Sequence, residues 1–308
     1  MPDVPRISET KRALLEKYLR ADLSQSVTAA ARGQGGTASL SSTDSRAPLV
    51  AIQANGSKWP FFYAHTHWVG GAFYAFTLAH SLGVNQPFYL LDPYRFDGLR
   101  VVPTLETMAE AYIASMRAVQ PEGPYRLGGF CGGGLVALEM AQQLQAAGQE
   151  VELLVLIEPG AGPIQFTRMV GRCIRRIGKL IRMGQDKQLD CFLRIRHMYR
   201  LLKYEEDEKM ERLSFTASAK ALRQDWMGLF VWSFSQYLPR LYPGKVAFFW
   251  AANDTKRRKM WPKVAKTRGE GEVYVIPGTH MGLVTDQLPL LSAQLRVCLD
   301  KVQAAALS

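Results

Sequence analysis

Beyond residue 48 the chain alternates short apolar runs with stretches of helical periodicity, and this alternation restricts the possible folds more than any other feature. Val151–Ile157 is the clearest apolar run, since only Glu152 in it is polar, as expected for a strand that is covered on both faces. Further strands are expected at 60–64, 86–91, 125–130, 245–250 and 272–276, and helices at 71–82, 104–119 and 135–147. The pattern predicts an α/β fold in which helices flank a mostly parallel central sheet.

The first 48 residues show no such alternation. Residues 1–23 are expected to contain a helix, because Ser8 and Thr10 precede a segment with an apolar side, Lys11–Leu23. Residues 24–48 are rich in Ser, Thr, Ala and Gly without apolar periodicity, which predicts a flexible linker. The globular domain is therefore expected at 49–308.

Residues 160–242 interrupt the alternation, because they have helical character and contain no apolar run typical of a strand. Val170, Ile174, Ile177 and Ile181 recur there at helical spacing, while Arg and Lys occupy the other faces. We interpret this segment as a helical lid inserted between two strands. Much of the net charge of +11 lies in it.

The positive charge favours an acidic partner, such as an acidic carrier protein or the phosphates of coenzyme A, although a merely solvated helix face would contain the same residues. Nucleic-acid binding is not expected, because the arginines belong to no recognisable nucleic-acid-binding fold. A membrane span is not expected either, since no run of about 18 apolar residues occurs. The chain begins without an apolar export signal, so its four cysteines are expected to be reduced thiols in the cytoplasm.

A glycine-rich turn follows the strand expected at 125–130. Residues 129–133 read Gly-Phe-Cys-Gly-Gly, which fits the G-x-C-x-G spacing of a nucleophile elbow with Cys131 where Ser is usual. Gly129 and Gly133 leave room for a strained backbone at the nucleophile, and the N-terminus of the following helix favours a thiolate. An inert core cysteine and a phosphate-binding loop, with Glu158 as the dinucleotide-binding acid, are the competing interpretations. The incomplete G-x-x-G pattern favours the elbow.

A cysteine nucleophile needs a base, and the base needs an orienting acid. His280 lies in a loop of small residues after the last expected strand, and the order of nucleophile, acid and histidine along the chain is that of the hydrolases. Glu158 ends the strand that follows the nucleophile's helix, which makes it the preferred acid. Asp254, after the next strand, is the alternative, although a turn residue is its simpler interpretation. Cys131, Glu158 and His280 are therefore the predicted catalytic residues.

The oxyanion of a tetrahedral intermediate needs two hydrogen-bond donors. The backbone N–H of Gly132, directly after the nucleophile, is one, and the second is expected from the loop at 64–71. His65 and His67 in that loop form a His-x-His pair, but no third ligand has a suitable spacing. A metal site is therefore not expected.

Together these residues resemble the thioesterase domains that close nonribosomal peptide and polyketide assembly lines. The match covers residues 60–159, is most specific in Gln120–Gly129 and Gly133–Ala141, and resumes weakly at 246–249 and at His280. The resemblance implies an α/β-hydrolase fold. It also implies an acyl or peptidyl chain delivered on phosphopantetheine, by a carrier protein or as acyl-CoA, with no cofactor bound by the domain itself.

The resemblance also assigns site residues. It places the triad acid on Glu158, where the family usually has Asp, and the second oxyanion donor on the N–H of His67, next to Thr66 where a glycine is common. With Cys131 in place of Ser, the sequence departs from the family at three positions, none of which removes a needed chemical function.

The activity expected from these residues is hydrolysis of a carrier-protein or CoA thioester through an acyl-Cys131 intermediate. An acyl-cysteine is itself a thioester and keeps its activation, so transfer to an amine or a hydroxyl, including cyclisation, is the first alternative. A non-enzymatic binder of an acidic carrier protein and a general esterase acting on oxygen esters are further hypotheses.

Overall fold

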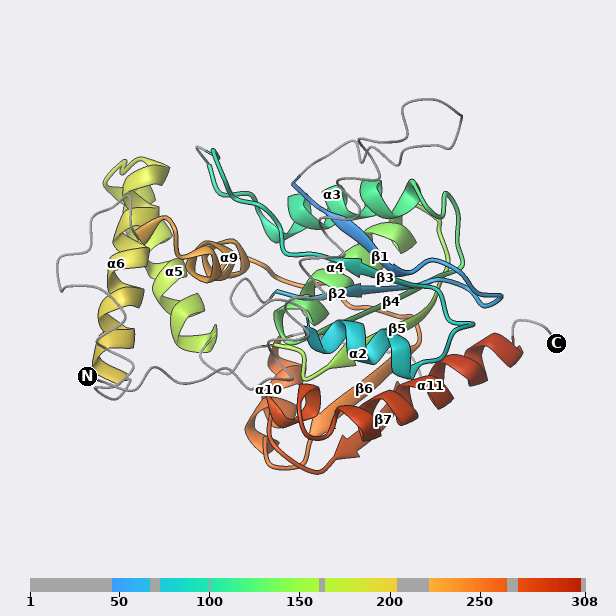
Figure 1. Ribbon diagram of the computed structural model, residues 1–308. Helices are drawn as coiled ribbons and strands as arrows, with labels where there is room; N and C mark the ends of the chain where they lie inside the picture. The colour runs from blue at the N-terminus through green and yellow to red at the C-terminus, as the bar shows by residue number, and fades with distance from the viewer. Residues whose placement is uncertain are drawn as a thin grey trace, which may run out of the picture. The chain divides into compact units, whose positions relative to one another are not determined.

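A seven-stranded sheet forms the centre of the computed structural model, which describes residues 46–66, 73–99, 101–160, 164–203, 222–264 and 271–305 (Figure 1). Its strands are β1 (Leu49–Gln53), β2 (Phe61–Ala64), β3 (Phe88–Leu91), β4 (Tyr125–Phe130), β5 (Val151–Ile157), β6 (Val246–Ala251) and β7 (Gly271–Ile276). In space they follow the order β1-β3-β2-β4-β5-β6-β7. Each neighbouring pair is parallel except β1 and β3, which are antiparallel. The predicted α/β fold with a mostly parallel sheet is confirmed.

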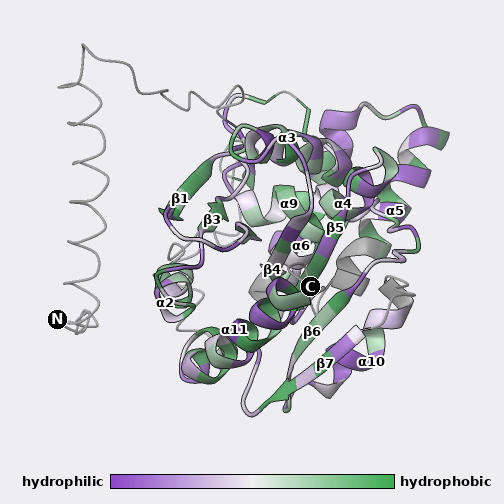
Figure 2. Ribbon diagram, turned by 90° about the vertical axis from the view of Figure 1, so that its right-hand side faces the viewer, coloured by the Kyte–Doolittle hydropathy of each residue, from purple (hydrophilic) through white to green (hydrophobic). Residues whose placement is uncertain are grey.

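Helices cover both faces of the sheet, so that its central strands are buried on both sides. Helices α3 (Leu105–Arg117) and α4 (Gly132–Ala146) pack on one face, and α2 (Phe73–Ser81) and α11 (Leu288–Ala305) pack on the other. Successive side chains of a strand join opposite cores: Phe62 belongs to the α3–α4 side and Tyr63 to the α2–α11 side. Figure 2 shows β5 and β6 in the hydrophobic colour along most of their length, as expected for strands that helices cover on both faces.

Three described helices lie between β5 and β6, within the segment for which a lid was predicted. They are α5 (Ile164–Leu180), α6 (Gln185–Lys203) and α9 (Trp226–Phe234), and they pack against one another beside the sheet (Figure 1). We call them the helical insertion. The guanidinium carbon of Arg175 on α5 lies 3.7 Å from the ring centroid of Trp232 on α9, which ties these two helices together.

Some elements differ from the prediction. α4 begins at Gly132 rather than Leu135, and β1, α10 (Thr255–Val264), the short η1 (Gly282–Val284) and α11 were not predicted. The predicted helix at 1–23 and the predicted linker up to residue 45 lie outside the described residues. None of the described helices has both the length and the apolar character that a bilayer-spanning segment needs.

Candidate active site

Cys131 lies at the sharp turn between β4 and α4, with backbone angles φ of 54° and ψ of −118°. The turn requires glycine on both sides. A Cβ at Gly129 would lie 2.4 Å from the carbonyl carbon of Gly133, and a Cβ at Gly133 would lie 2.0 Å from the carbonyl oxygen of Ala64. Both distances are well inside van der Waals contact, so the G-x-C-x-G spacing has a direct steric cause.

The N-terminus of α4 lies at the sulfur of Cys131. The backbone N–H of Gly132 lowers the pKa of the thiol, and the N–H of Gly134 donates to the carbonyl oxygen of Cys131 at 3.2 Å. Because unpaired N–H groups at a helix N-terminus favour negative charge, this position stabilises a thiolate. The side chain of Cys131 remains partly exposed.

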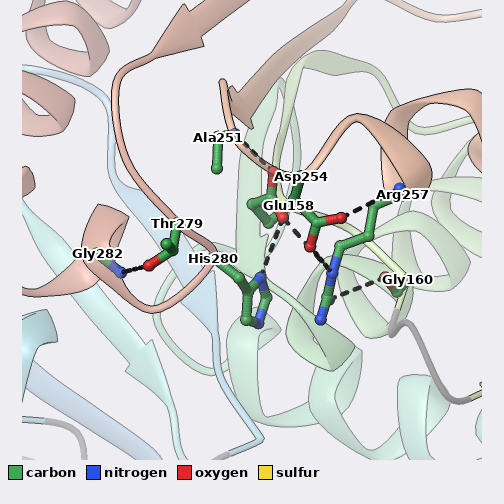
Figure 3. A network of polar contacts seen from close by, with 8 residues as sticks. All are labelled: Glu158, Gly160, Ala251, Asp254, Arg257, Thr279, His280 and Gly282. Carbon is green, nitrogen blue, oxygen red and sulfur yellow. Dashed lines mark hydrogen bonds and ion pairs between the residues drawn. The ribbon is translucent and has the colours of Figure 1, made fainter.

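His280 follows β7 in a loop and its ring lies beside Cys131, the predicted nucleophile. The imidazole lowers the pKa of the Cys131 thiol and stacks on Phe130, with ring centroids 4.6 Å apart and an interplanar angle of 21°. Its Nδ1 lies 3.1 Å from Oε2 of Glu158 (Figure 3). The ring therefore connects the thiol to the carboxylate.

Glu158 directly follows β5 and is completely buried. Its backbone φ is 46°, and its N–H donates to the carbonyl oxygen of Phe249 on β6 at 2.8 Å. The carboxylate oxygen that does not face His280, Oε1, accepts from the N–H of Ala251 at 2.6 Å. The acid is thus held by the carboxyl end of β6, where its other oxygen is directed to the imidazole.

The surroundings of Cys131 and His280 favour a thiolate–imidazolium pair. Burial raises the pKa of the Cys131 thiol, but the hydrogen bond and charge of His280, the charge of Arg257 and the N–H of Gly132 together bring that pKa below its usual value. Burial lowers the pKa of His280, whereas its contacts with Cys131 and Glu158 raise it to about 8. The two shifts therefore both favour transfer of the thiol proton to His280.

Asp254, the alternative acid, lies at the start of α10 and contacts Arg257. Its Oδ1 accepts from the N–H of Arg257 at 3.4 Å, and its Oδ2 accepts from Nε of the same residue at 2.5 Å. The structure thus brings Cys131, Glu158 and His280 together, while it pairs Asp254 with Arg257 beside Glu158.

The structure describes the predicted oxyanion donors only in part. The N–H of Gly132 lies at the nucleophile, whereas His67 lies outside the described residues. A Cβ at Gly132 would lie 2.7 Å from Oγ1 of Thr66 and 2.9 Å from Cε1 of Phe230, so the end of β2 and helix α9 both approach this point. Within the described ranges no cluster of three or more His, Cys, Asp or Glu side chains is suited to a metal ion. His65, one member of the His-x-His pair, instead contacts a carboxylate, with its Nε2 3.0 Å from Oδ1 of Asp92.

Sequence reasoning did not single out Phe130, Phe230 or Arg257. Phe130 is the variable residue inside the elbow motif, and its ring supports His280. Phe230 comes from an apolar helix in the insertion, which carries no motif. Arg257 stands in a run of basic residues, 256–259, where the sequence alone gives no reason to select one of them.

Comparison with known proteins shows what the chain is similar to. The sequence model of the thioesterase domain family matches residues 64–296, which is most of the chain. The chain is 35% identical over 111 residues to atromentin synthetase nps3 of Serpula lacrymans and 31% identical over 161 residues to atromentin synthetase greA of Suillus grevillei. It is 38% identical over 112 residues to a dimodular nonribosomal peptide synthase of Bacillus subtilis. These alignments cover 36%, 51% and 36% of the chain, but only 11%, 15% and 5% of the relatives.

Solved structures have the same fold. The NocB thioesterase domain, in covalent complex with a fluorophosphonate nocardicin G analogue, matches with a TM-score of 0.53 and 23% identity, over 82% of this chain and 99% of that one. A four-domain nonribosomal peptide synthetase, AB3403, matches with a TM-score of 0.51 and 19% identity, over 82% of this chain and 20% of that one. This likeness confirms the predicted α/β-hydrolase fold.

Proposed function

The chain belongs to the thioesterase domain family and is an enzyme of that type, and on this premise we propose that it releases an acyl or peptidyl chain from a phosphopantetheine thioester through an acyl-cysteine intermediate on Cys131. The observation that carries the proposal is the position of His280, whose Nδ1 lies 3.1 Å from Oε2 of Glu158 and whose ring lowers the pKa of the Cys131 thiol at the turn. Nucleophile, base and orienting acid follow one another there in the order that covalent catalysis requires.

The first half-reaction transfers the acyl group to sulfur. The Cys131 thiolate attacks the carbonyl carbon of the bound thioester, and the resulting oxyanion accepts a hydrogen bond from the N–H of Gly132 and from a second donor. The C–S bond to pantetheine then breaks. The departing thiolate takes the proton of the His280 imidazolium, which leaves acyl-Cys131, a free pantetheine thiol and a neutral imidazole.

The second half-reaction regenerates the enzyme. Neutral His280 accepts a proton from a water molecule that attacks the acyl carbon, while Glu158 holds the ring and stabilises the imidazolium that forms. The tetrahedral intermediate collapses with Cys131 as the leaving thiolate, so that the thiolate–imidazolium pair returns and a carboxylic acid is released.

Water is the proposed acceptor because hydrolysis is the default of the family. Since acyl-Cys131 is a thioester, a positioned amine or hydroxyl would replace water without a change in the protein's chemistry. Such a nucleophile would also give up its proton to His280. Transfer or cyclisation is therefore the second candidate function.

The proposed substrate carrier is an acyl or peptidyl carrier protein. Two observations support this choice. The curated relatives are synthetases that share the thioesterase region with this chain, and helix α5 contributes exposed cations, among them Arg172, Arg176 and Lys179, that suit an acidic partner. The domain itself is proposed to bind no cofactor, because phosphopantetheine arrives with the substrate, and the proposed location is the cytoplasm.

A release assay tests the proposal. Hydrolysis of an acyl-pantetheine thioester should be lost in Cys131→Ala and kept in Cys173→Ala, since Cys173 lies exposed on α5 away from the turn. An oxygen ester of the same acyl chain should be the poorer substrate, because the pantetheine thiolate is the better leaving group. Full turnover in Cys131→Ala would refute the acyl-cysteine intermediate. Binding of an acyl carrier protein without release of its acyl group would instead support the non-enzymatic binder.

A further inference from the structure

We propose that Arg257 is a positioning residue of the active site, which joins Glu158 to Asp254 and supplies a positive charge beside the Cys131–His280 pair. The inference rests on the proposed roles of Cys131 and His280, and it adds a residue that acts on them without contact to the substrate.

The side chain of Arg257 reaches from α10 to the segment that follows β5. Its Nε lies 2.5 Å from Oδ2 of Asp254 and 3.7 Å from Oε2 of Glu158, and its Nη1 donates to the carbonyl oxygen of Gly160 at 3.4 Å. Figure 3 shows these contacts in one network with His280. An arginine that served only the start of α10 would need Asp254 alone, whereas this one also holds the triad acid.

The contact with Glu158 is made at the oxygen that faces the imidazole. Oε2 lies 3.1 Å from Nδ1 of His280, and the same atom lies 3.7 Å from Nε of Arg257. With Oε1 fixed by the N–H of Ala251 at 2.6 Å, both carboxylate oxygens are held. Arg257 therefore restricts the orientation in which Glu158 meets His280.

The charge of Arg257 is only weakly screened by water, because 16% of its side chain is exposed. The groups that face Cys131 and His280 come from several elements. Tyr63 on β2 and Tyr74 on α2 have a pKa raised mainly by burial, so they stay neutral at ordinary pH. Glu158 and Arg257 are charged groups that act on this pair, and Asp254 contacts Arg257.

The signs of these charges give opposite predictions for the two members of the Arg257–Asp254 pair. A positive charge stabilises the Cys131 thiolate and destabilises the His280 imidazolium, and Arg257 lowers the pKa of both groups. Removing that charge should raise both values. Removing the negative charge of Asp254, with Arg257 left in place, should lower both.

The experiment is alkylation of Cys131 by iodoacetamide as a function of pH, followed by mass spectrometry of the peptide that contains it. It uses the full chain and needs no turnover. Relative to the unmodified protein, Arg257→Gln should move the midpoint upward by about half a pH unit to one unit, and Asp254→Asn should move it downward. Arg257→Lys retains the charge and should keep the midpoint. Asp254→Asn keeps a side-chain oxygen for the N–H of Arg257, which preserves the start of α10.

The outcomes separate this inference from the proposed function. Midpoints that do not move, or that move in the same direction in Arg257→Gln and Asp254→Asn, would overturn the role of Arg257 even if acyl-Cys131 forms. Opposite shifts in a protein that forms no acyl adduct would support Arg257 and refute the proposed function. A purely structural role would weaken folding in both variants without opposite shifts.

Discussion

Cys131 and Glu158 both adopt a left-handed backbone, with φ of 54° and 46°. Such conformations cost on the order of 1–3 kcal/mol each in non-glycine residues. Two backbone hydrogen bonds offset this cost. The N–H of Cys131 donates to the carbonyl oxygen of Ile157 at 2.9 Å, and the N–H of Glu158 donates to the carbonyl oxygen of Phe249 at 2.8 Å. Strain at these two positions directs both side chains to His280. The glycines next to Cys131 made its turn predictable, whereas no neighbour of Glu158 signals its positive φ.

Gly133→Ala should destabilise the fold, because the added Cβ would lie 2.0 Å from the carbonyl oxygen of Ala64. We expect a loss of about 3 kcal/mol in the free energy of unfolding, measured by urea denaturation. Gly184→Ala is the matched control, since its Cβ would have nothing within 4 Å. Equal stability of the two variants would contradict the steric explanation of the glycine spacing.

Glu158→Gln should slow thioester release and change its pH dependence. The carboxylate is one of the groups that raise the pKa of His280 to about 8 against the effect of burial. Without it that pKa should fall, and less of the pair should be thiolate–imidazolium at neutral pH. We expect kcat/KM for an acyl-pantetheine to drop at least about tenfold, with the exposed Glu150→Gln unchanged. A pH–rate profile identical to that of the unmodified protein would show that Glu158 does not act on His280.

Strands were easier to predict than helices at the level of elements. β5 and β6 are buried on both faces, so their sequences are apolar almost throughout. β1 is a half-buried edge strand and gives a weak signal. α4 begins at Gly132, before the predicted residue. The prediction missed its first turn because Gly132, Gly133 and Gly134 disfavour a helix in isolation, whereas at this turn a Cβ at any of the three would lie within 3.2 Å of a neighbouring atom. The charged sequence of α10 has no clear apolar side, which is why the sequence did not predict the helix that carries Arg257.

The contact between α5 and α9 should contribute to the stability of the helical insertion. Arg175 stacks over Trp232 at 3.7 Å and its Nη2 donates to the carbonyl oxygen of that residue at 3.4 Å. We expect Arg175→Ala to lower the free energy of unfolding by about 1–2 kcal/mol. It should also raise the KM for an acyl thioester, since α9 carries Phe230 next to Gly132. Arg176→Ala, on the exposed side of the same helix, should change neither the stability nor the KM for an acyl-pantetheine, which has no acidic carrier protein for Arg176 to contact. A loss of stability in Arg176→Ala with none in Arg175→Ala would contradict the role of the Arg175–Trp232 contact.

At the scale of the whole molecule, the family and the fold were predictable while the substrate was not. The elbow, its flanking segments Gln120–Gly129 and Gly133–Ala141, and the late histidine are local patterns, and they indicated the thioesterase family that the match over residues 64–296 shows. The helical periodicity of the insertion reports packing but not the shape of a binding surface. The net charge of +11 likewise indicates an acidic partner without identifying it.

The most direct test of the acyl-cysteine is the intact mass of the protein after brief incubation with an acyl-pantetheine thioester, with and without an added amine. The account predicts a mass increase equal to one acyl group, located on Cys131 by peptide mapping, absent in Cys131→Ala and present in Cys173→Ala. Disappearance of the adduct in water alone would identify hydrolysis, and faster loss with an acylated amine as product would identify transfer. Turnover of the thioester with no adduct on Cys131 at any time, together with normal turnover by Cys131→Ala, would contradict the acyl-cysteine intermediate.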